Sequence, residues 1–525
     1  MAVTLHKQAN CGFVMLNSPP VNAINQKMRE DLIDAVTWAE SEGLERVILS
    51  GMGRSFAAGA DTKEFDHPAI SPHLPDVVNR IETSTVPWIA AIHGTALGGG
   101  GELALGCRYR IARADATIGF PEVILGLVPG AGATQRLPRL VGLAEALKLI
   151  PTGKTISGKA AMAIGLVNAI DDDPVAAAKL IDQKILSEAV PLSLMKAGTD
   201  KTVSYDTARQ LAIRRMRGQE APLTAISLLE TAQTATFDDG MQKERNAFLA
   251  LRASPQARAL RHIFFAERAA KKPPKAIETQ KPTLKPLNHV IVIGGGTMGS
   301  GIAYAFLNAN IRVTILESDD AGMQRANTAI DTIISASLAS GHIDQQAATD
   351  RRNLLKVMMA QPDSDAGKRR NDDLTNVDLV IEAVFEDLAI KKEILQAIEP
   401  ALDPNAIIAT NTSYLDVNKL AACLDNPSRF VGLHFFAPAH IMKLLEIVKG
   451  SETSPVALAM GYAVAKSLGK MPVVAGVCDG FIGNRILAAL REAADATLMD
   501  GSTPAEIDRA MVAFGYAMGP YETQD

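Results

Sequence analysis

A glycine-rich turn between two short apolar runs constrains the fold of this chain more than any other feature. The run HVIVIGG at 289–295 leads into Gly294-x-Gly296-x-x-Gly299, and a helical pattern begins within these glycines. The next apolar run ends at Glu317, about twenty residues further on. Glycines let a pyrophosphate approach the backbone at a helix N-terminus, where free N–H groups favour negative charge. Strand, glycine turn, helix, strand and acid in this order predict a dinucleotide-binding unit.

The acid at the end of the second strand indicates which dinucleotide binds. A carboxylate at Glu317 can accept a hydrogen bond from the ribose 2′-hydroxyl and would repel a 2′-phosphate. NAD is therefore expected rather than NADP, held by Gly294, Gly296, Gly299 and Glu317. The alternative is a Rossmann-like fold that binds no nucleotide.

The same region must be distinguished from a membrane span, because residues 286–311 contain no Asp, Glu, Lys or Arg. A spanning helix needs about 20 apolar residues. This stretch instead contains Asn288, His289, Asn308 and Asn310 together with three successive glycines. A strand, a turn and a helix are therefore expected here, and no membrane span.

Strand-like and helical patterns alternate on both sides of a polar break. The segment at about 270–287 is rich in Pro and Lys, which predicts a solvated connector after a helix at 257–270. Before the break, strands are expected at 45–51 and 87–94, and helices at 143–150 and 174–186. After it, the strand-like runs are 289–295, 312–318, 377–384, 406–413 and 430–436, which indicate a doubly wound sheet. From about 479 the pattern is helical.

Three glycine-containing segments in the first half carry a second set of candidate residues. They are SFAAGADTKEF (55–65), HGTALGGGGELALGC (93–107) and IGFPEVILGLVPGAGATQRL (118–137). Gly98 to Gly101 run into a helical pattern at Glu102, and Glu122 follows a turn among apolar residues. Free N–H groups at such a helix start suit a developing negative charge. Each segment alone could equally be a tight turn with an acid of no catalytic role.

Together with NSPPVNAIN (17–25), these segments resemble the crotonase (enoyl-CoA hydratase/isomerase) superfamily. The resemblance implies that the N–H groups of Ala60 and Gly99 bind the thioester oxygen of an acyl-CoA. It also implies that Glu102 and Glu122 hold a water between them, one as acid and one as base. Relatives that only isomerise double bonds often lack one acid, so hydration is expected, with isomerisation by Glu122 as a side activity.

A histidine and a glutamate in the second half form a further candidate pair. His434 lies in an apolar run, where a lone histidine is more often a core residue, but Glu446 follows 12 residues later in another strand-like run. A carboxylate can orient an imidazole, which can then take a hydroxyl proton while hydride leaves the same carbon.

The segments around this pair resemble the 3-hydroxyacyl-CoA dehydrogenase family. The resemblance implies that His434 and Glu446 are catalytic, that Ser413 and Asn484 contact the substrate, and that Glu386 and Lys391 lie near the nicotinamide and its ribose. One position departs from the family: Ala437 stands where monofunctional relatives usually carry Asn, which removes one polar contact to the substrate.

The order of the two motif sets resembles the multifunctional β-oxidation enzymes of the peroxisomal type 1 or bacterial kind. The expected architecture is α/β: a crotonase-fold domain (1–250), a linker helix and connector (251–287), a Rossmann-type NAD-binding domain (288–479) and a short helical remnant (480–525). The expected reaction is hydration of trans-2-enoyl-CoA to (3S)-3-hydroxyacyl-CoA, then oxidation with NAD to 3-ketoacyl-CoA.

Alternatives concern the second half, because relatives carry roughly two hundred helical residues after the sheet and this chain carries about 45. The resemblance therefore predicts a C-terminally truncated form with an exposed apolar helix face. The dehydrogenase half would then be weak, or would only bind NAD or acyl-CoA. A noncatalytic acyl-CoA-binding protein is the remaining alternative.

Composition limits the partners and the compartment. The 525 residues carry a net charge of −5, which argues against nucleic-acid binding, and acyl-CoA thioesters are the expected ligands. Four cysteines, none spaced as a pair or a zinc knuckle, predict reduced thiols and no metal site. No signal peptide is recognised, so a cytoplasmic location is expected, and a peroxisomal one stays open. The sequence does not indicate an oligomeric state.

Overall fold

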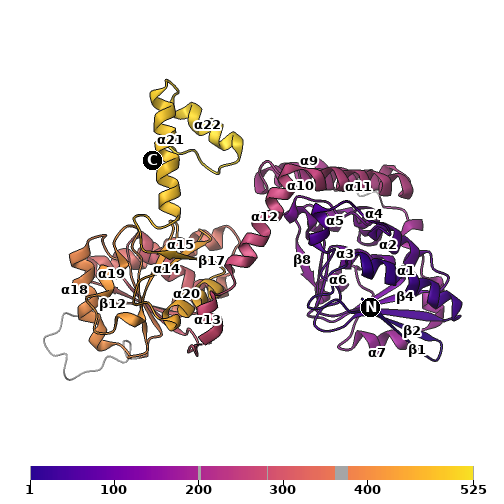
Figure 1. The fold of residues 1–525 in the computed structure, drawn as a ribbon, viewed down its shortest axis with the longest axis horizontal. Helices are drawn as coiled ribbons and strands as arrows, with labels where there is room; N and C mark the ends of the chain where they lie inside the picture. The colour runs from indigo at the N-terminus through magenta and orange to yellow at the C-terminus, as the bar shows by residue number, and fades with distance from the viewer. Residues whose placement is uncertain (1, 199–202, 281, 361–375, 524–525) are drawn as a thin grey trace. The chain divides into compact units, whose positions relative to one another are not determined.

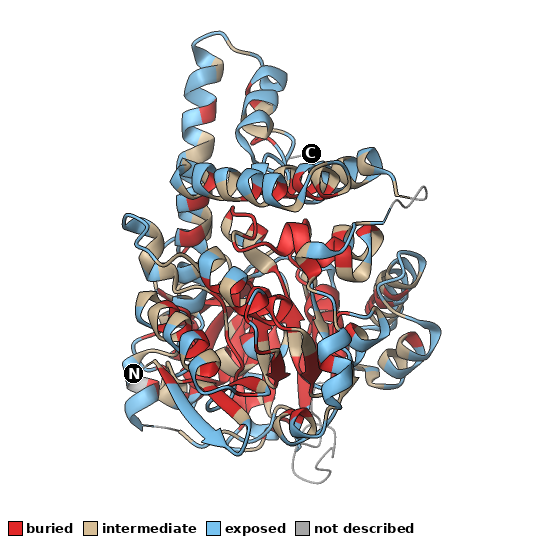
Figure 2. Ribbon diagram, turned by 90° about the vertical axis from the view of Figure 1, so that its right-hand side faces the viewer, coloured by how far each residue is buried: buried red, intermediate tan, exposed pale blue. Residues whose placement is uncertain are grey.

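The computed structural model describes residues 2–198, 203–280, 282–360 and 376–523 (Figure 1). The chain forms two compact units, Met1–Phe264 and Phe265–Asp525. Each unit has its own hydrophobic cores, with Val14, Leu49 and Trp88 among the buried residues of the first and Val292, Ile381 and Leu433 among those of the second. Most strands of both units are buried; Figure 2 colours the residues by their burial.

The first unit is built on a six-stranded sheet. Its strands, in sheet order, are β1 (Val3–Gln8), β2 (Cys11–Leu16), β3 (Arg46–Gly51), β4 (Trp88–Ile92), β6 (Tyr109–Ala112) and β9 (Ala169–Ile170). Only β1 and β2 pair antiparallel among these neighbours, as a hairpin that turns at Ala9 with φ +52°. A second, three-stranded sheet contains β5 (Thr95–Leu97), β7 (Thr117–Gly119) and β8 (Thr155–Ser157). The expected strands at 45–51 and 87–94 are therefore confirmed.

Helices complete the first unit. The main ones are α1 (Gln26–Ser41), α2 (Leu74–Glu82), α3 (Gly99–Gly106), α4 (Ala133–Val141), α5 (Leu143–Leu149), α9 (Tyr205–Arg215), α10 (Glu220–Thr234) and α11 (Phe237–Ala253), followed by α12 (Pro255–Ala270). The single helix expected at 174–186 is wrong. The segment forms α7 (Pro174–Lys179) and α8 (Gln183–Glu188), because Asp182 caps the second helix and Leu180, at 85% exposure, has no core position to fill.

The second unit contains one eight-stranded sheet. In sheet order its strands are β12 (Leu355–Met359), β11 (Arg312–Glu317), β10 (His289–Ile293), β13 (Leu379–Glu382), β14 (Ile407–Thr410), β15 (Phe430–Phe435), β16 (Leu444–Lys449) and β17 (Met471–Gly476). Neighbouring strands are parallel except β15 and β16. The main helices between them are α14 (Thr297–Asn308), α15 (Asp320–Ala339), α16 (Gln345–Asn353), α18 (Leu388–Ile398), α19 (Val417–Ala421) and α20 (Pro455–Ser467).

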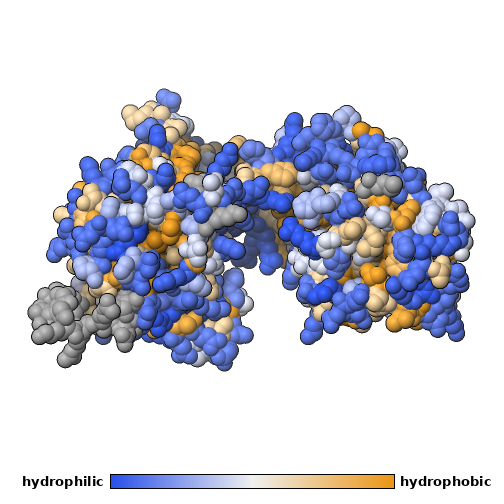
Figure 3. Space-filling model, turned by 60° about the horizontal axis from the view of Figure 1, so that its bottom comes forward, coloured by the Kyte–Doolittle hydropathy of each residue, from blue (hydrophilic) through white to orange (hydrophobic). Residues whose placement is uncertain are grey.

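Residues 270–311 contain the expected connector and the stretch without charged residues that was distinguished from a membrane span. Residues 286–311 form β10, the glycine turn and α14 rather than one helix. Within the described residues, no helix is long and apolar enough to cross a membrane, and the face seen in Figure 3 is mostly hydrophilic. The connector was expected to be solvated, but part of it is packed. It contains α13 (Lys275–Gln280), which contacts α20 and buries Ile277 in the core of the second unit.

Two further helices follow the sheet, α21 (Gly483–Met499) and α22 (Pro504–Phe514), and they pack against each other. Each has a single buried residue, Ala494 or Ile507. Ile486, Met499 and Phe514 are exposed by 67%, 85% and 83%. The expected exposure of apolar side chains on these helices is therefore confirmed.

Candidate active sites

Glu102 and Glu122 come together at the start of α3. Glu102 is buried in the first turn of α3, and Glu122 lies in the short helix η2 (Pro121–Leu125). Gly98 precedes α3 at φ +52°, and a Cβ there would lie only 2.8 Å from Glu122 Oε1. Glycine is required at this position both for its backbone angle and for the space that the carboxyl group occupies.

The two carboxyl groups have different environments. Glu102 Oε1 accepts hydrogen bonds from the N–H groups of Ala131 (2.7 Å) and Ala133 (3.1 Å). Burial raises the pKa of Glu102 to about 6, and these two bonds oppose the rise. Glu122 Oε2 is buried without a hydrogen-bond partner in the described part of the chain. Burial, and then the charge of Glu102, raise the pKa of Glu122 well above its ordinary value. Of the two, Glu102 is therefore the carboxyl group that ionises more readily, and Glu122 is the one that keeps its proton to higher pH.

The backbone N–H groups of Ala60 and Gly99 lie next to this pair. Ala60 is held by a bridge to Ile24, whose N–H donates to Gly59 and whose carbonyl accepts from Asp61. Gly99 is the first residue of α3, and a Cβ on it would lie 3.4 Å from the Ala60 nitrogen. Neither N–H donates to another residue of the described ranges. Two neighbouring free donors can stabilise an oxyanion.

A third buried carboxylate near this site, Glu244 on α11, was not predicted. Its side chain is fully buried and accepts from the N–H groups of Gly132 (2.6 Å) and Thr134 (2.9 Å). The sequence does carry a signal for it, because Glu244 lies on the face of α11 that also buries Gly240 and Leu251. A charge on the apolar face of a helix needs a buried partner.

His434 and Glu446 face each other across the antiparallel strands β15 and β16. His434 Nδ1 lies 2.7 Å from Glu446 Oε2, and His434 Nε2 lies 3.2 Å from the Ser413 hydroxyl. Burial raises the pKa of Glu446, but hydrogen bonds from His434 and from the Gly483 N–H outweigh burial and hold it below its usual range. The carboxylate therefore stays charged and orients the imidazole.

Asn484 is the second residue of α21, so it lies at the end of the helix that contacts Glu446. The N–H groups of Gly483 (2.7 Å) and Ile482 (3.1 Å) donate to Glu446 Oε1. No hydrogen bond of the Asn484 side chain to a described residue is found, and the side chain is partly exposed. The backbone of this turn therefore binds Glu446, whereas the Asn484 side-chain amide has no hydrogen-bond partner among the described residues and can bind a ligand.

Glu386 and Lys391 lie in one polar network with a residue that was not predicted, Glu382. The Lys391 ammonium donates to both carboxylate oxygens of Glu382 (2.7 and 3.0 Å) and lies 3.3 Å from Glu386. Lys391 and Glu382 are fully buried. Glu386 in turn accepts from the N–H of Ser413 at 2.8 Å, which connects the network to the His434 site. Glu382 is a charged residue within an apolar strand run, which indicates a buried charge that needs a partner. This signal was not used in the sequence-based prediction.

The glycine turn has the geometry that a dinucleotide requires. Gly294 has φ +91°, and a Cβ on Gly299 would lie 1.8 Å from the Gly294 carbonyl oxygen, so neither position tolerates a side chain. A Cβ on Gly296 would meet no atom within 4 Å, which leaves space over the start of α14. Glu317 ends β11 and accepts from the Gly295 N–H at 2.5 Å. These residues fit the pyrophosphate and ribose of NAD.

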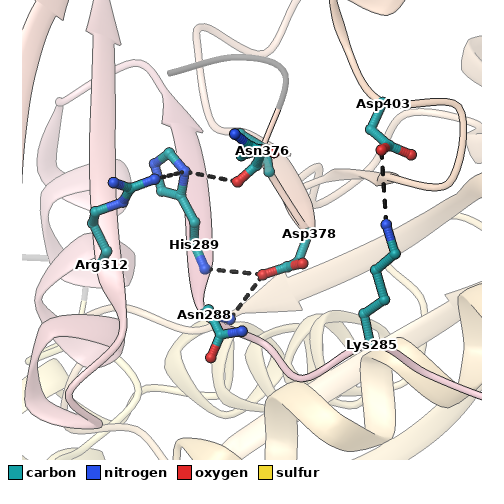
Figure 4. Close-up of a pocket in the computed structure, with 8 residues that line it drawn as sticks. Lys285, Asn288, His289, Arg312, Asn376, Asp378 and Asp403 are labelled. Atoms are coloured by element: carbon teal, nitrogen blue, oxygen red, sulfur yellow. Dashed lines mark hydrogen bonds and ion pairs between the residues drawn. The ribbon is translucent and has the colours of Figure 1, made fainter. Parts of the chain in front are cut away.

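A separate cavity of about 370 Å³ lies at the amino ends of β10 and β11, whereas the glycine turn follows the carboxyl end of β10 (Figure 4). Asp378 accepts there from the backbone N–H groups of Asn288 and His289, and Arg312 lies 2.9 Å from the His289 ring. None of the predicted site residues lines it. Its polar groups hold the starts of neighbouring strands together.

Comparisons with known proteins agree with this division of the chain. Family models match residues 6–243 (enoyl-CoA hydratase/isomerase), 289–478 (3-hydroxyacyl-CoA dehydrogenase, NAD binding domain) and 480–525 (3-hydroxyacyl-CoA dehydrogenase, C-terminal domain).

Three relatives cover both halves. The peroxisomal bifunctional enzyme of Cavia porcellus is 37% identical over 100% of this chain and 72% of its own length. The human peroxisomal bifunctional enzyme is 36% identical over 98% of this chain and 70% of its own length. The fatty acid oxidation complex subunit alpha of Shewanella baltica is 34% identical over 95% of this chain and 71% of its own length. The chain belongs to the family of bifunctional fatty acid β-oxidation enzymes, which join an enoyl-CoA hydratase to an NAD-dependent 3-hydroxyacyl-CoA dehydrogenase.

Proposed function

We propose that Glu102 is the general base and Glu122 the general acid of the hydratase. The observation that carries this assignment is the difference between the two: backbone N–H groups stabilise charge on Glu102, while Glu122 Oε2 is buried without a donor among the described residues. Glu102 takes a proton from water, the water oxygen bonds to C3 of trans-2-enoyl-CoA, and C2 takes the proton of Glu122. Proton exchange with solvent then restores both carboxyl groups.

The N–H groups of Ala60 and Gly99 have a defined role in this step. Electron density moves from the double bond to the thioester oxygen as water adds, and two preorganised donors stabilise that charge in the transition state. Glu122 can also carry a proton between C2 and C4, which supports isomerisation of 3-enoyl-CoA as a side activity.

In the second unit, His434 removes the hydroxyl proton of a (3S)-3-hydroxyacyl-CoA. Glu446 orients its ring through Nδ1, which leaves Nε2, beside Ser413, to receive the proton. Gly294, Gly296, Gly299 and Glu317 would hold NAD, and the bound cofactor would supply a hydride acceptor beside the carbon that carries this hydroxyl. Asn484 and the Ser413 hydroxyl bind the substrate oxygens, and Glu386 and Lys391 support the nicotinamide end of the site.

The functional domains that follow from these roles are 1–250 for the hydratase, 251–287 for the linker, and 288–479 with 480–525 for the dehydrogenase. The free cysteines Cys11, Cys107, Cys423 and Cys478 support a reducing, cytoplasmic location. Detection in a cytosolic fraction, rather than in an organelle or an oxidising compartment, would support that location.

A coupled assay tests the function. A short trans-2-enoyl-CoA and NAD are supplied, and loss of the enoyl thioester absorbance and formation of NADH are followed together. Both signals are expected to change. If neither changes in a folded protein, the assignment of both sites is wrong.

A hydratase whose second unit only binds NAD or acyl-CoA is the second candidate. The apolar side chains that α21 and α22 leave exposed favour it, because α21 begins beside the His434 pair, where the Gly483 N–H donates to Glu446. Loss of the enoyl signal without NADH would support this candidate over the bifunctional one.

A further inference from the structure

The N-terminus of α4 is held by two buried glutamate side chains in alternation. The N–H groups of Ala131 and Ala133 donate to Glu102, at 2.7 and 3.1 Å. Those of Gly132 and Thr134, at 2.6 and 2.9 Å, donate to Glu244. The first N–H groups of a helix lack acceptors within it, and here four successive residues of the chain find acceptors in two buried side chains.

We propose that Glu244 is a positioning residue of the hydratase, which fixes segment 131–134 so that this segment can hold Glu102 in its catalytic place and charge state. The proposal rests on the proposed role of Glu102 as the base. Among the described residues Glu244 makes no hydrogen bond to Glu102, and its acceptor atoms are taken by Gly132 and Thr134. Its effect passes through the backbone segment that the two glutamate side chains share.

The packing around Glu244 leaves little freedom for this segment. The Thr134 hydroxyl donates a third bond to Glu244, at 2.6 Å. A Cβ on Gly240, one turn earlier on α11, would lie 2.1 Å from the Gln135 side-chain oxygen. A Cβ on Gly130 would lie 2.8 Å from the Phe248 ring, one turn later on α11. Helix α11 therefore lies directly against the chain on both sides of the shared segment.

The other side of the segment has a separate anchor. Arg136 donates to the Ala131 carbonyl oxygen at 3.2 Å and forms a buried ion pair with Glu82 at 2.7 Å. Arg136 therefore binds the carbonyl group of Ala131, whereas Glu244 binds the N–H groups of Gly132 and Thr134. Loss of Glu244 would therefore let the N–H groups turn while the chain stays attached through Arg136.

The charge state of Glu244 simplifies the test. Burial raises the pKa of Glu244 to about 8, and the charge of Glu102 adds to the rise. Glu102 titrates at about 6, where Glu244 is still protonated. Replacing Glu244 by Gln thus exchanges one neutral group for another at that pH, and a shift in Glu102 reports position rather than lost charge.

The experiment compares Glu244→Gln with two other variants of the full-length chain. A Gln side chain accepts at one atom but presents an N–H₂ group to the second backbone donor, so the segment must move. Thr134→Val is the milder variant, because it keeps both backbone donors to Glu244. It removes the hydroxyl bond to Glu244 and the bond that this hydroxyl accepts from the Gln135 side chain at 3.0 Å. Glu40→Gln is the control in the same unit, since Glu40 also accepts from neighbouring residues, Ser84 and Thr85, and pairs with Arg80, but makes no hydrogen bond to segment 131–134 among the described residues.

The first measurement is the titration of Glu102, read by carbon NMR of isotope-labelled glutamate carboxyl groups and assigned by its loss in Glu102→Gln. This readout needs no turnover. The pKa of Glu102 is expected to rise in Glu244→Gln, to rise less in Thr134→Val and to stay unchanged in Glu40→Gln, because only the first two weaken its N–H bonds.

The second measurement is the pH profile of hydration. Glu244→Gln is expected to lower kcat by about tenfold or more, with KM changed less, and to move the acidic limb to higher pH. An unchanged Glu102 titration in a folded Glu244→Gln, or a shift to lower pH, would overturn the proposal. If Glu102 shifts as expected while Glu102→Gln keeps the full rate, the catalytic assignment fails and the positioning contact stands.

Discussion

His434 and Glu446 are direct cross-strand partners, and their side chains meet at 2.7 Å because β15 and β16 are the antiparallel neighbours in an otherwise parallel sheet. Directly opposed residues of antiparallel strands point to the same face, so strand register alone brings the acid to the imidazole.

We expect Glu446→Gln to slow turnover in the dehydrogenase reaction by about 100-fold or more, because a neutral amide does not stabilise the imidazolium.

The measurement is NADH formation at saturating NAD. Glu399→Gln is the control, since Glu399 is also a buried acceptor in this unit, bound by the N–H groups of Asp425 and Asn426 and by Arg429. Equal losses in the two variants would mean that the effect of Glu446 is structural.

Hydration should depend on pH through Glu102. Its pKa of about 6 means that the base becomes protonated below that value. We expect kcat to fall about tenfold per pH unit on the acid side. A stopped-flow or steady-state series at constant ionic strength measures this, and a rate that is flat down to about pH 4, near the ordinary carboxyl pKa, would exclude Glu102 as the base.

Glu122→Gln should abolish hydration and also change how stability varies with pH. The folded pKa of Glu122 is raised, so the folded protein holds a proton that the unfolded chain releases above its ordinary pKa. Such a group stabilises the fold most below the unfolded pKa, and that contribution is lost as pH rises towards the folded pKa. The Gln variant should therefore lose less Tm than the wild type between about pH 5 and about pH 8, a range that lies above the ordinary carboxyl pKa. Parallel Tm curves from calorimetry would contradict the raised pKa.

Lys391→Met should destabilise the second unit. It leaves the buried Glu382 carboxylate with only the Thr410 hydroxyl and the Val384 N–H as donors among the described residues. Removing one partner of a buried ion pair costs about 3–5 kcal/mol in the free energy of unfolding. Urea unfolding measures the loss. The double variant Lys391→Met/Glu382→Gln serves as its control, and should recover part of the loss because no unpaired charge remains.

Glu317→Ser should weaken the discrimination between NAD and NADP. Glu317 ends β11 beside the glycine turn, where its charge repels a 2′-phosphate. We expect kcat/KM for NAD to fall and that for NADP to rise. Measuring both cofactors with the same 3-hydroxyacyl-CoA checks this, and an unchanged ratio would remove Glu317 from the ribose site.

Much of this protein could be predicted from local patterns. The glycine turn, the strands on either side of it and the acid at Glu317 follow from backbone freedom and from apolar runs, which act over a few residues. The roles of Glu102, Glu122 and His434 were accessible because each lies within a recognisable segment. They stay predictions until the variants are measured.

Tertiary structure decided the contacts made over long distances along the chain. Glu244 lies 112 residues from Gly132, and nothing near Glu244 in the sequence indicates that partner. The packing of α13 also depended on neighbours from elsewhere in the fold. Local sequence determined which segments form strands, turns and helices, because propensity and periodicity act between near neighbours. Burial determined which carboxylates are shared, protonated or paired, because the cost of a buried charge depends on every group that the fold brings to it.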